Sequence, residues 1–462
     1  MFPLLVLLAV VHCCAAFDVE KTTALGRVGG SRIGVLGRTV EEYRGIPYAK
    51  PPLGSLRFRP PEPLQSWDDV VAISPLLSSG VEFSEDCLHL NIWTPVARYQ
   101  VPVPVLVSIH GGGFSHGSAS VDIFNGGILA ARSGFVVVSF NYRLGVLGFL
   151  DAKSTEAPGN VGLMDQNLAL RWIQAHIHHF RGDPSKVTIF GVSAGAMSAH
   201  AHVLSPMSRG LFRTACLMSG TFHSPDFVEH VSDSMSKGDV VARRVGCLVG
   251  NTTLASSPES VVACLRTKRA DDLVHCYNRK FQVQDISVLA DVSPTSSCPK
   301  IRLRRSKTAP STQPDLIVGV TTDEGVTALL YPRRHELLAE KIEGLDEAYF
   351  NRSIHETIFS WLKNNSSSNL ATYTAEARDK AALRRAYVDF LSDRTFVCPK
   401  HFTAEGHSEA RRTFYQKLER DLTESNTDTT PRYVLRFFSS VYSSVRSQAT
   451  LVSAVDVQLN QY

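Results

Sequence analysis

A serine between two glycines is the residue of this sequence best suited to nucleophilic chemistry. Residues 191–195 read Gly-Val-Ser-Ala-Gly, directly after the apolar run Val187–Phe190 and at the start of the helix-like stretch Ala194–Leu204. The glycines allow a sharp turn between strand and helix, which holds Ser193 on an exposed, strained elbow. The helix N-terminus presents unpaired N–H groups and a positive dipole end to a developing oxyanion. The pattern predicts Ser193 as a nucleophile.

A glycine run supplies a second element of the same kind. The segment His110-Gly111-Gly112-Gly113 follows the apolar run Val103–Ile109. Because glycine has no Cβ, the backbone N–H groups of such a loop can approach a carbonyl oxygen closely. Alone, this segment would be an ordinary glycine loop. Together with the serine, it predicts acyl transfer with the oxyanion held by backbone N–H groups.

The elements that must position these residues alternate in type between about residues 101 and 219. Apolar runs lie at Val103–Ile109, Phe135–Phe140 and Val187–Phe190, and the apolar residues of Asn167–Phe180 recur with a helical period. Strand, crossover helix, strand is typical of a parallel sheet that is buried on both faces. The sequence therefore predicts an α/β fold in which both glycine elements follow a strand.

Composition limits the classes of function. The chain has 462 residues, of which 44% are hydrophobic and 20% charged, with a net charge of +4. This apolar fraction excludes a disordered or fibrous chain, and the nearly balanced charge argues against nucleic acid as a partner. No cysteine or carboxylate completes a ligand spacing around the clustered histidines, so we expect no metal and no cofactor and place them on helix surfaces: His176, His178, His179, His200 and His202.

The N-terminus and the cysteines indicate the secretory route. Residues 1–16 form a short apolar stretch that ends in small residues, which predicts a signal peptide cut after Ala16; a buried N-terminal helix is the alternative. The longest other apolar run, Phe135–Leu150, is too short to span a membrane. An odd number of cysteines follows the signal, so at least one is unpaired. Glycosylation sequons, consistent with a secreted, extracellular protein, occur at Asn251, Asn351, Asn364 and Asn365.

A larger set of motifs is spread over the N-terminal half of the chain. These motifs are Tyr43–Ala49, Pro51–Gly54, Arg57-Phe58, Ser84–Asn91, Asn141–Leu144 and Gly159–Gln166. With them the chain resembles the type-B carboxylesterase family, which includes the cholinesterases. The resemblance covers most of residues 28–219 and continues patchily to about residue 440. It implies an α/β-hydrolase fold over residues 17–462, with a central, mostly parallel sheet flanked by helices.

The resemblance also implies roles for individual residues. Ser193 would be the nucleophile, and the N–H groups of Gly112, Gly113 and Ala194 would form the oxyanion hole. Glu324, in the Asp-Glu-Gly segment after the strand-like residues 317–321, would be the acid that orients a catalytic imidazole. Structural pairs implied by the family are a disulfide between Cys247 and Cys264 and ion pairs of Arg44 with Glu85 and of Arg143 with Asp165.

No histidine matches the position of the family's catalytic base. In the family this residue follows a strand that Arg432–Phe437 resembles, and no histidine occurs between that segment and Tyr462. His401 and His407 fall where the family has a helix before the strand, so we expect them at the surface. The chain is therefore predicted to lack the C-terminal part of the family fold, and its turnover to be severely reduced, because a serine hydroxyl needs a base.

Two functions follow from these observations. The first is a secreted serine carboxylic-ester hydrolase that acts on a small-molecule ester through an acyl-enzyme. Between Trp67 and Ser84 only Phe83 is aromatic, whereas cholinesterases have a tryptophan there that attracts a quaternary ammonium, so esters with apolar parts are expected. The alternative is a non-catalytic, cholinesterase-like binding or adhesion protein. The sequence does not indicate an oligomeric state.

Overall fold

The structure is a computed structural model, and parts of the chain are described. The described residues are 17–67, 70–71, 84–96, 101–224, 231–278, 314–321, 324, 382, 385, 388–389, 392–408 and 413–418. The predicted signal peptide, Phe83, the strand-like segment Arg432–Phe437 and the sequons at Asn351, Asn364 and Asn365 lie outside them. Among the described helices, none combines the length and the apolar character needed to cross a bilayer.

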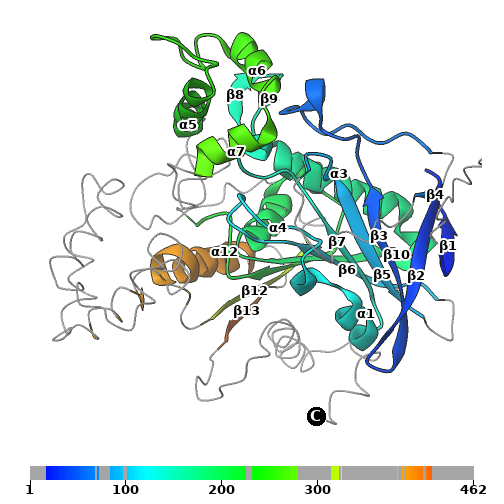
Figure 1. Ribbon diagram of the computed structural model, residues 1–462. Coiled ribbons are helices and arrows are strands. Elements are labelled where there is room, and N and C mark those ends of the chain that lie inside the picture. The colour runs from blue at the N-terminus through cyan, green and yellow to red at the C-terminus, as the bar shows by residue number, and fades with distance from the viewer. Residues whose placement is uncertain are drawn as a thin grey trace, which may run out of the picture.

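A large mixed sheet runs through the molecule (Figure 1). Its order is β1-β2-β3-β5-β7-β6-β10-β11-β12-β13, with β4 (Val70–Val71) paired to β2. Neighbours from β1 to β7 are antiparallel, and those from β7 to β13 are parallel. The strands are β1 (Val19–Thr22), β2 (Arg27–Val35), β3 (Arg38–Pro47), β5 (His89–Pro95), β6 (Val103–Ile109), β7 (Val136–Phe140), β10 (Gly182–Val192), β11 (Thr214–Met218), β12 (Asp315–Thr321) and β13 (Thr413–Leu418).

Helices cover both faces of this sheet, with α1 on one side and α3 and α4 on the other (Figure 1). A two-stranded sheet of β8 (Asp151–Ser154) and β9 (Ala157–Pro158) lies apart from it. The α-helices are α1 (Gly127–Ser133), α2 (Gly145–Phe149), α3 (Val161–His176), α4 (Ala194–Leu204), α5 (Val231–Arg244), α6 (Pro258–Arg266), α7 (Ala270–Asn278) and α12 (Cys398–Ser408). Short 3₁₀ turns lie at Gly54–Leu56, Asp122–Phe124, Ile177–Phe180 and Pro206–Ser208, and a π-helix lies at Asp393–Val397.

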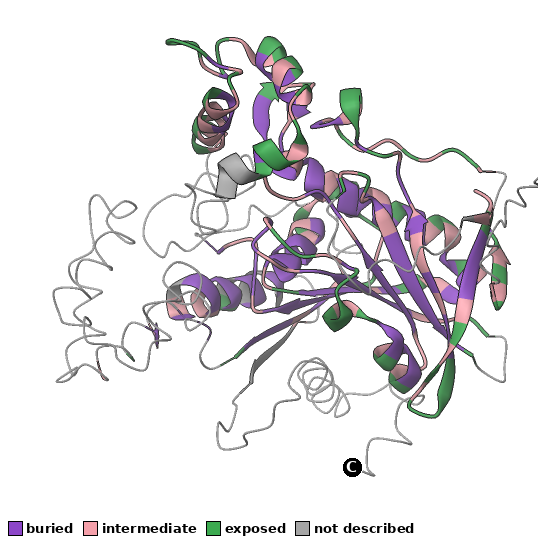
Figure 2. Cartoon of the chain, in the orientation of Figure 1, coloured by how far each residue is buried: buried purple, intermediate pink, exposed green. Residues whose placement is uncertain are grey.

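The alternation of side chains along the strands divides the hydrophobic core into two layers. In β7, Val136 and Val138 pack in the larger cluster, together with Ile173 of α3, while Val137 packs in the smaller one with Ala130 of α1. Successive strand residues point to opposite faces, so a strand covered on both sides is apolar throughout. The central strands are accordingly buried along most of their length (Figure 2).

The predicted elements around the serine are present. β6 coincides with the predicted run Val103–Ile109, and α4 with Ala194–Leu204. The periodic segment that ends at Phe180 is α3 followed by a 3₁₀ turn, and it begins earlier than expected, at Val161. Beside β12 the sheet continues with β13, a strand that the sequence analysis did not predict.

The placement of two histidines on a helix surface was wrong. His200 and His202 of α4 are 2% and 4% exposed. His202 Nδ1 lies 2.8 Å from Ser208 Oγ and Nε2 lies 3.0 Å from Gln166 Oε1, so both nitrogens are satisfied in the neutral ring. Within the described residues no group of three or more His, Cys, Asp or Glu side chains is arranged to hold a metal ion.

The burial of His202 predicts a loss of stability in acid. Burial lowers its pKa to about 4, below the ordinary value of 6.5. The unfolded chain therefore binds the proton more readily, and the stabilisation present above pH 6.5 is lost as the pH falls towards 4. From pH 7 to pH 5 we expect this residue to cost about 2 kcal/mol of unfolding free energy. Urea denaturation should show a smaller acid loss in His202→Gln; an equal loss in both proteins would contradict the prediction.

Candidate active site

Ser193 occupies the turn between β10 and α4 in a conformation that non-glycine residues rarely adopt. Its φ is 56° and its ψ is −124°. The Ser193 N–H donates a hydrogen bond of 2.9 Å to Met218 O of the neighbouring strand β11, and its carbonyl accepts one of 2.9 Å from the Met197 N–H in α4. Such strain persists where the surrounding structure fixes the backbone. The Ser193 side chain is half-buried. Because Ser193 directly follows β10, its hydroxyl lies at the carboxyl end of the sheet.

The two glycines of the elbow allow it to pack backbone against backbone. A Cβ on Gly195 would lie 2.1 Å from Ile109 O, at the end of β6. A Cβ on Gly191 would lie 2.4 Å from the carbonyl carbon of Gly195. No heavy-atom contact is that short, so any side chain at these positions would separate β6 from the elbow.

Replacing Gly195 by alanine should therefore disturb the elbow. The added methyl group meets a backbone carbonyl, which cannot rotate away, and such overpacking typically costs about 1–3 kcal/mol. We expect Gly195→Ala to lower the urea midpoint strongly. Gly34→Ala in β2 is the matched control, because a Cβ there has no neighbour within 4 Å. Equal midpoints for the two variants would show that β6 and the elbow are not packed as described.

The triple-glycine loop lies against the serine. The position of a Cβ on Gly111 is 2.5 Å from Val192 O and 3.5 Å from Ser193 Cβ. Gly112 and Gly113 have φ values of 116° and 58°, in the region that favours glycine. Within the described part of the chain, three N–H groups of the loop and the elbow donate no hydrogen bond to protein: those of Gly112, Gly113 and Ala194. An anionic oxygen would satisfy such donors.

His110 helps to fix the loop without being a base. Its ring stacks on Tyr142 with centroids 4.4 Å apart, and the Tyr142 hydroxyl donates a 2.9 Å hydrogen bond to His110 O. The His110 Nδ1–H donates to Gly111 O at 2.9 Å. Burial lowers the pKa of His110 to about 4, so the ring is neutral at pH 7. Its role is to hold the backbone from which Gly112 and Gly113 follow.

Glu324 follows β12, on the far side of β11 from the elbow. The carboxylate Oε1 accepts a 2.8 Å hydrogen bond from the Thr321 N–H and another from the Ser219 hydroxyl. Ser219 comes directly after β11, and its N–H donates to Gly319 O of β12 at 3.0 Å. The side chain of Glu324 is 5% exposed. The ends of three parallel strands thus place Ser193, Ser219 and Glu324 along one edge of the sheet.

The candidate nucleophile and the candidate acid have no imidazole partner among the described residues. None of their histidines hydrogen-bonds to Ser193 Oγ or to Glu324. His407 lies in the expected helix, α12, but its placement at the surface was wrong: it is 7% exposed, and its Nε2–H donates to Pro314 O at 2.9 Å. His401 is exposed, as expected.

Comparison with known proteins shows the family to which the chain belongs. The sequence profile of the Carboxylesterase family matches residues 18–434. The chain belongs to this family. Carboxylesterases have the α/β-hydrolase fold, and the mixed sheet with helices on both faces is that fold. The resemblance inferred from the sequence motifs is therefore confirmed.

Individual carboxylesterases resemble the chain over part of their length. It is 42% identical to the acetylcholinesterase of Electrophorus electricus over 299 residues, which are 59% of the chain and 46% of that relative. Identity to the cholinesterase of Mus musculus is 38% over 342 residues, 68% of the chain and 55% of the relative. The acetylcholinesterase of Danio rerio is 40% identical over 299 residues, 59% and 46% of the two proteins. The chain spans about half the length of these curated relatives.

One of the two ion pairs implied by the carboxylesterase resemblance is present, and the other was wrong. Arg143 and Asp165 form a buried bidentate pair, with Nε–Oδ2 and Nη2–Oδ1 distances of 2.8 and 2.7 Å. Glu85, however, pairs with Arg57 at 2.7 Å, while Arg44 pairs with Glu42. Both arginines lie in family motifs, so the sequence alone did not decide which one reaches Glu85.

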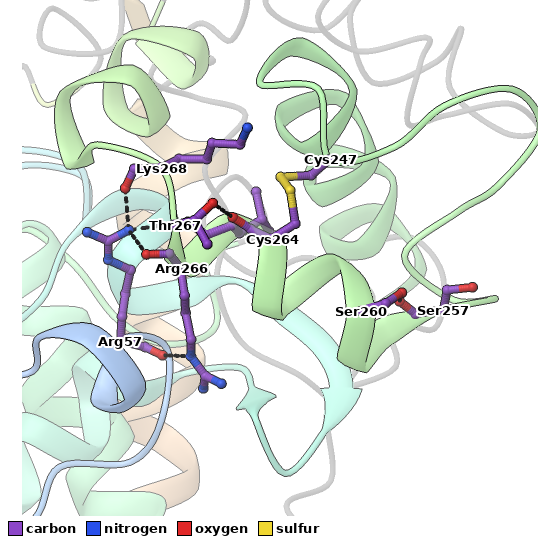
Figure 3. The surroundings of a disulfide bond; sticks show 9 residues. Arg57, Cys247, Ser257, Ser260, Cys264, Arg266, Thr267 and Lys268 are labelled. Atoms are coloured by element: carbon purple, nitrogen blue, oxygen red, sulfur yellow. Dashed lines mark hydrogen bonds between the residues drawn. A yellow bond between two sulfur atoms is a disulfide. The ribbon is translucent and has the colours of Figure 1, made fainter.

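Arg57 also holds the disulfide loop. The structure joins Cys247, after α5, to Cys264 of α6, the pairing implied by the family (Figure 3). The Nη1 group of Arg57 donates to carbonyl oxygens of the following turn, at 3.2 Å for Arg266 and 2.6 Å for Lys268. The guanidinium therefore connects an N-terminal family motif to the cross-linked region.

Two neighbours of the site were not identified from the sequence. Ser219 follows an apolar strand, so the rule that parallel strands end at one edge could have found it. No sequence pattern indicated Lys400 of α12 as a neighbour of the site, because the sequence does not show that its helix packs against β12. Val192, the residue before the serine, is 42% exposed.

Proposed function

We propose that this carboxylesterase is a secreted serine carboxylic-ester hydrolase that forms an acyl-enzyme on Ser193. The observation that carries the proposal is the strained Ser193 with Gly111 of the glycine loop packed against it, together with the N–H groups of Gly112, Gly113 and Ala194, which have no protein acceptor among the described residues. Donors that are fixed before the reaction stabilise the charge that develops on a carbonyl oxygen. The disulfide Cys247–Cys264 is consistent with the oxidising conditions of the secretory route.

The proposed reaction has two steps. Ser193 Oγ attacks the ester carbonyl carbon and gives its proton to water, and the carbonyl oxygen becomes an oxyanion that accepts hydrogen bonds from Gly112, Gly113 and Ala194. The C–O bond to the alcohol then breaks and the leaving alkoxide takes a proton from water. In the second step a water molecule attacks the acyl-enzyme, which releases the acid and restores the Ser193 hydroxyl. Glu324 has the role of the triad acid. Because no imidazole of the described residues hydrogen-bonds to Ser193, turnover is expected to be slow.

The proposed substrates are small carboxylic esters with apolar acyl or alcohol parts. The relatives named above are cholinesterases. This chain lacks a tryptophan between Trp67 and Ser84, so a ring face for a quaternary ammonium is not supplied by that segment. Hydrolysis of p-nitrophenyl butyrate should exceed that of butyrylthiocholine. A clear preference for the choline ester would contradict this specificity.

The second candidate function is that of a non-catalytic, cholinesterase-like binding protein. It is favoured by the lack, within the described residues, of an imidazole that hydrogen-bonds to Ser193. The two functions differ in whether the serine reacts. Incubation of residues 17–462 with a fluorophosphonate probe, read by intact mass, should give one adduct per chain if Ser193 is a working nucleophile. No adduct at an excess of probe would favour the binding protein.

A further inference from the structure

A fully buried lysine lies next to the candidate acid. Lys400 of α12 has 0% exposure, and its Nζ donates to Gly319 O. This carbonyl is the only hydrogen-bond acceptor of Nζ among the residues that the structure describes. Lysines are almost never fully buried unless they are paired, because an ammonium group loses its hydration there. The position therefore costs folding free energy that a leucine or methionine would not.

Lys400 is connected to Glu324 through two residues. Gly319 O, which accepts from Lys400, also accepts a 3.0 Å hydrogen bond from the Ser219 N–H. The Ser219 hydroxyl in turn donates to Glu324 Oε1. In the described part of the chain, no cationic side chain hydrogen-bonds directly to this carboxylate. A buried cation and a buried anion thus lie at the two ends of one short network.

Lys400 does not hydrogen-bond to Ser193. Its Nζ donates to Gly319 O of β12, whereas the Ser193 N–H donates to Met218 O of the neighbouring strand β11. Neighbouring strands are about 4.8 Å apart, so the Ser193 and Gly319 backbones are separated by about 10 Å. The described contacts therefore link Lys400 to Ser219 and Glu324 rather than to Ser193.

We propose that Lys400 is a positioning residue of the candidate active site, whose ammonium group balances the charge of the Glu324 carboxylate and fixes the Gly319–Ser219 backbone that supports it. The proposal rests on the role of Glu324 as the triad acid. It explains why an ionisable side chain occupies a site inside the protein where an apolar one would fit. A buried charge lowers the cost of burying its opposite.

The other titratable groups around α12 do not supply this counter-charge. Burial raises the pKa of the Cys216 thiol to about 12, so it is neutral below that pH. Three residues along α12 from Lys400, Thr403 Oγ1 accepts a 2.9 Å hydrogen bond from His223, whose ring lies 5.0 Å from that of His200. Burial lowers the pKa of both histidines, which keeps them uncharged at pH 7. Among the groups that the structure describes around Lys400, Glu324 is the one left to pair with it.

The pH dependence of stability tests the pairing without requiring turnover. Burial lowers the pKa of Lys400 to about 7 from 10.5, while the charge of Glu324 opposes this shift. Between these pH values the unfolded chain holds a proton that the folded chain has released, so stability rises as the pH rises from 7 to about 10. Urea midpoints measured from pH 6 to pH 10 should show this rise in the wild type, and Lys400→Met should remove it.

Glu324→Gln is the decisive variant. Without the carboxylate, the buried ammonium of Lys400 loses its stabilising counter-charge. We therefore expect the pH at which the urea midpoint begins to rise to be lower by at least one unit, which corresponds to a tenfold loss of proton affinity at Lys400. Lys50→Met, which removes a surface pair with Glu62 at 2.8 Å, is the control and should leave the profile unchanged.

An unchanged profile in Glu324→Gln, or a rise that persists in Lys400→Met, would overturn the proposal. Glu324→Gln retains the lysine and carries the test by itself if Lys400→Met does not fold. The outcome is independent of the reactivity of Ser193: a shifted profile in a chain that no probe labels would contradict the proposed hydrolase and leave the Lys400–Glu324 pair standing. A chain that the probe labels, but whose profile does not shift in Glu324→Gln, would support the proposed hydrolase and contradict the Lys400–Glu324 pair.

Discussion

Ser193→Ala is expected to abolish covalent labelling by a fluorophosphonate. The probe needs a hydroxyl that can attack phosphorus and donors that stabilise the charged oxygen, and alanine removes the first while leaving the second. Because the side chain is half-buried and its φ of 56° is set by the backbone, alanine should fit the turn. Labelling should fall from about one adduct per chain to none, and intact mass measures it directly.

A matched serine and an ester assay complete this experiment. Ser185→Ala, at an exposed serine whose hydroxyl donates to Asp183 at 2.6 Å, should label like the wild type. Hydrolysis of p-nitrophenyl butyrate should be weak in the wild type, since triad enzymes that lack one member retain about 10³–10⁴-fold catalysis over water. Rapid turnover that Ser193→Ala removes would mean that a base from outside the described residues reaches the serine. Labelling that survives the substitution would refute Ser193 as the nucleophile.

Breaking the buried Arg143–Asp165 pair is expected to have the largest effect on stability. The two side chains are 4% and 0% exposed, and Asp165 Oδ2 also accepts a 3.0 Å hydrogen bond from the Arg143 N–H. Arg143→Met leaves a carboxylate in the core without its counter-charge, which typically costs about 3–5 kcal/mol. The unfolding free energy from urea denaturation at pH 7 measures this loss.

The surface pair Lys50–Glu62 provides the comparison. Its Nζ–Oε2 distance of 2.8 Å is similar, but its side chains are 41% and 46% exposed. Exposed pairs contribute about 0–1 kcal/mol, so Lys50→Met should change the unfolding free energy little. The double variant Arg143→Met with Asp165→Leu should recover part of the loss, because no unpaired charge then remains. Equal effects of Arg143→Met and Lys50→Met would contradict the assignment of burial as the cause.

The elements around Ser193 could be predicted because their signals are local. Apolar runs that are covered on both faces appear as continuous stretches, and β6 and α4 have the predicted bounds for this reason. β13 could not be found in this way, because Thr413–Leu418 reads Thr-Phe-Tyr-Gln-Lys-Leu and is not apolar throughout. The placement of His200 and His202 was wrong because a helical period does not show that α4 is covered on more than one side.

The sequence by itself determined the family, the glycine-flanked serine and the glycine loop, since these depend on residue types at fixed spacing. Tertiary structure alone decided that Gly111 lies against Ser193, that Arg57 rather than Arg44 reaches Glu85, and that Lys400 is buried near Glu324. Each of these contacts joins residues that are far apart in the chain. Their free energies depend on distance and on the exclusion of water, and neither quantity is a property of a local sequence pattern.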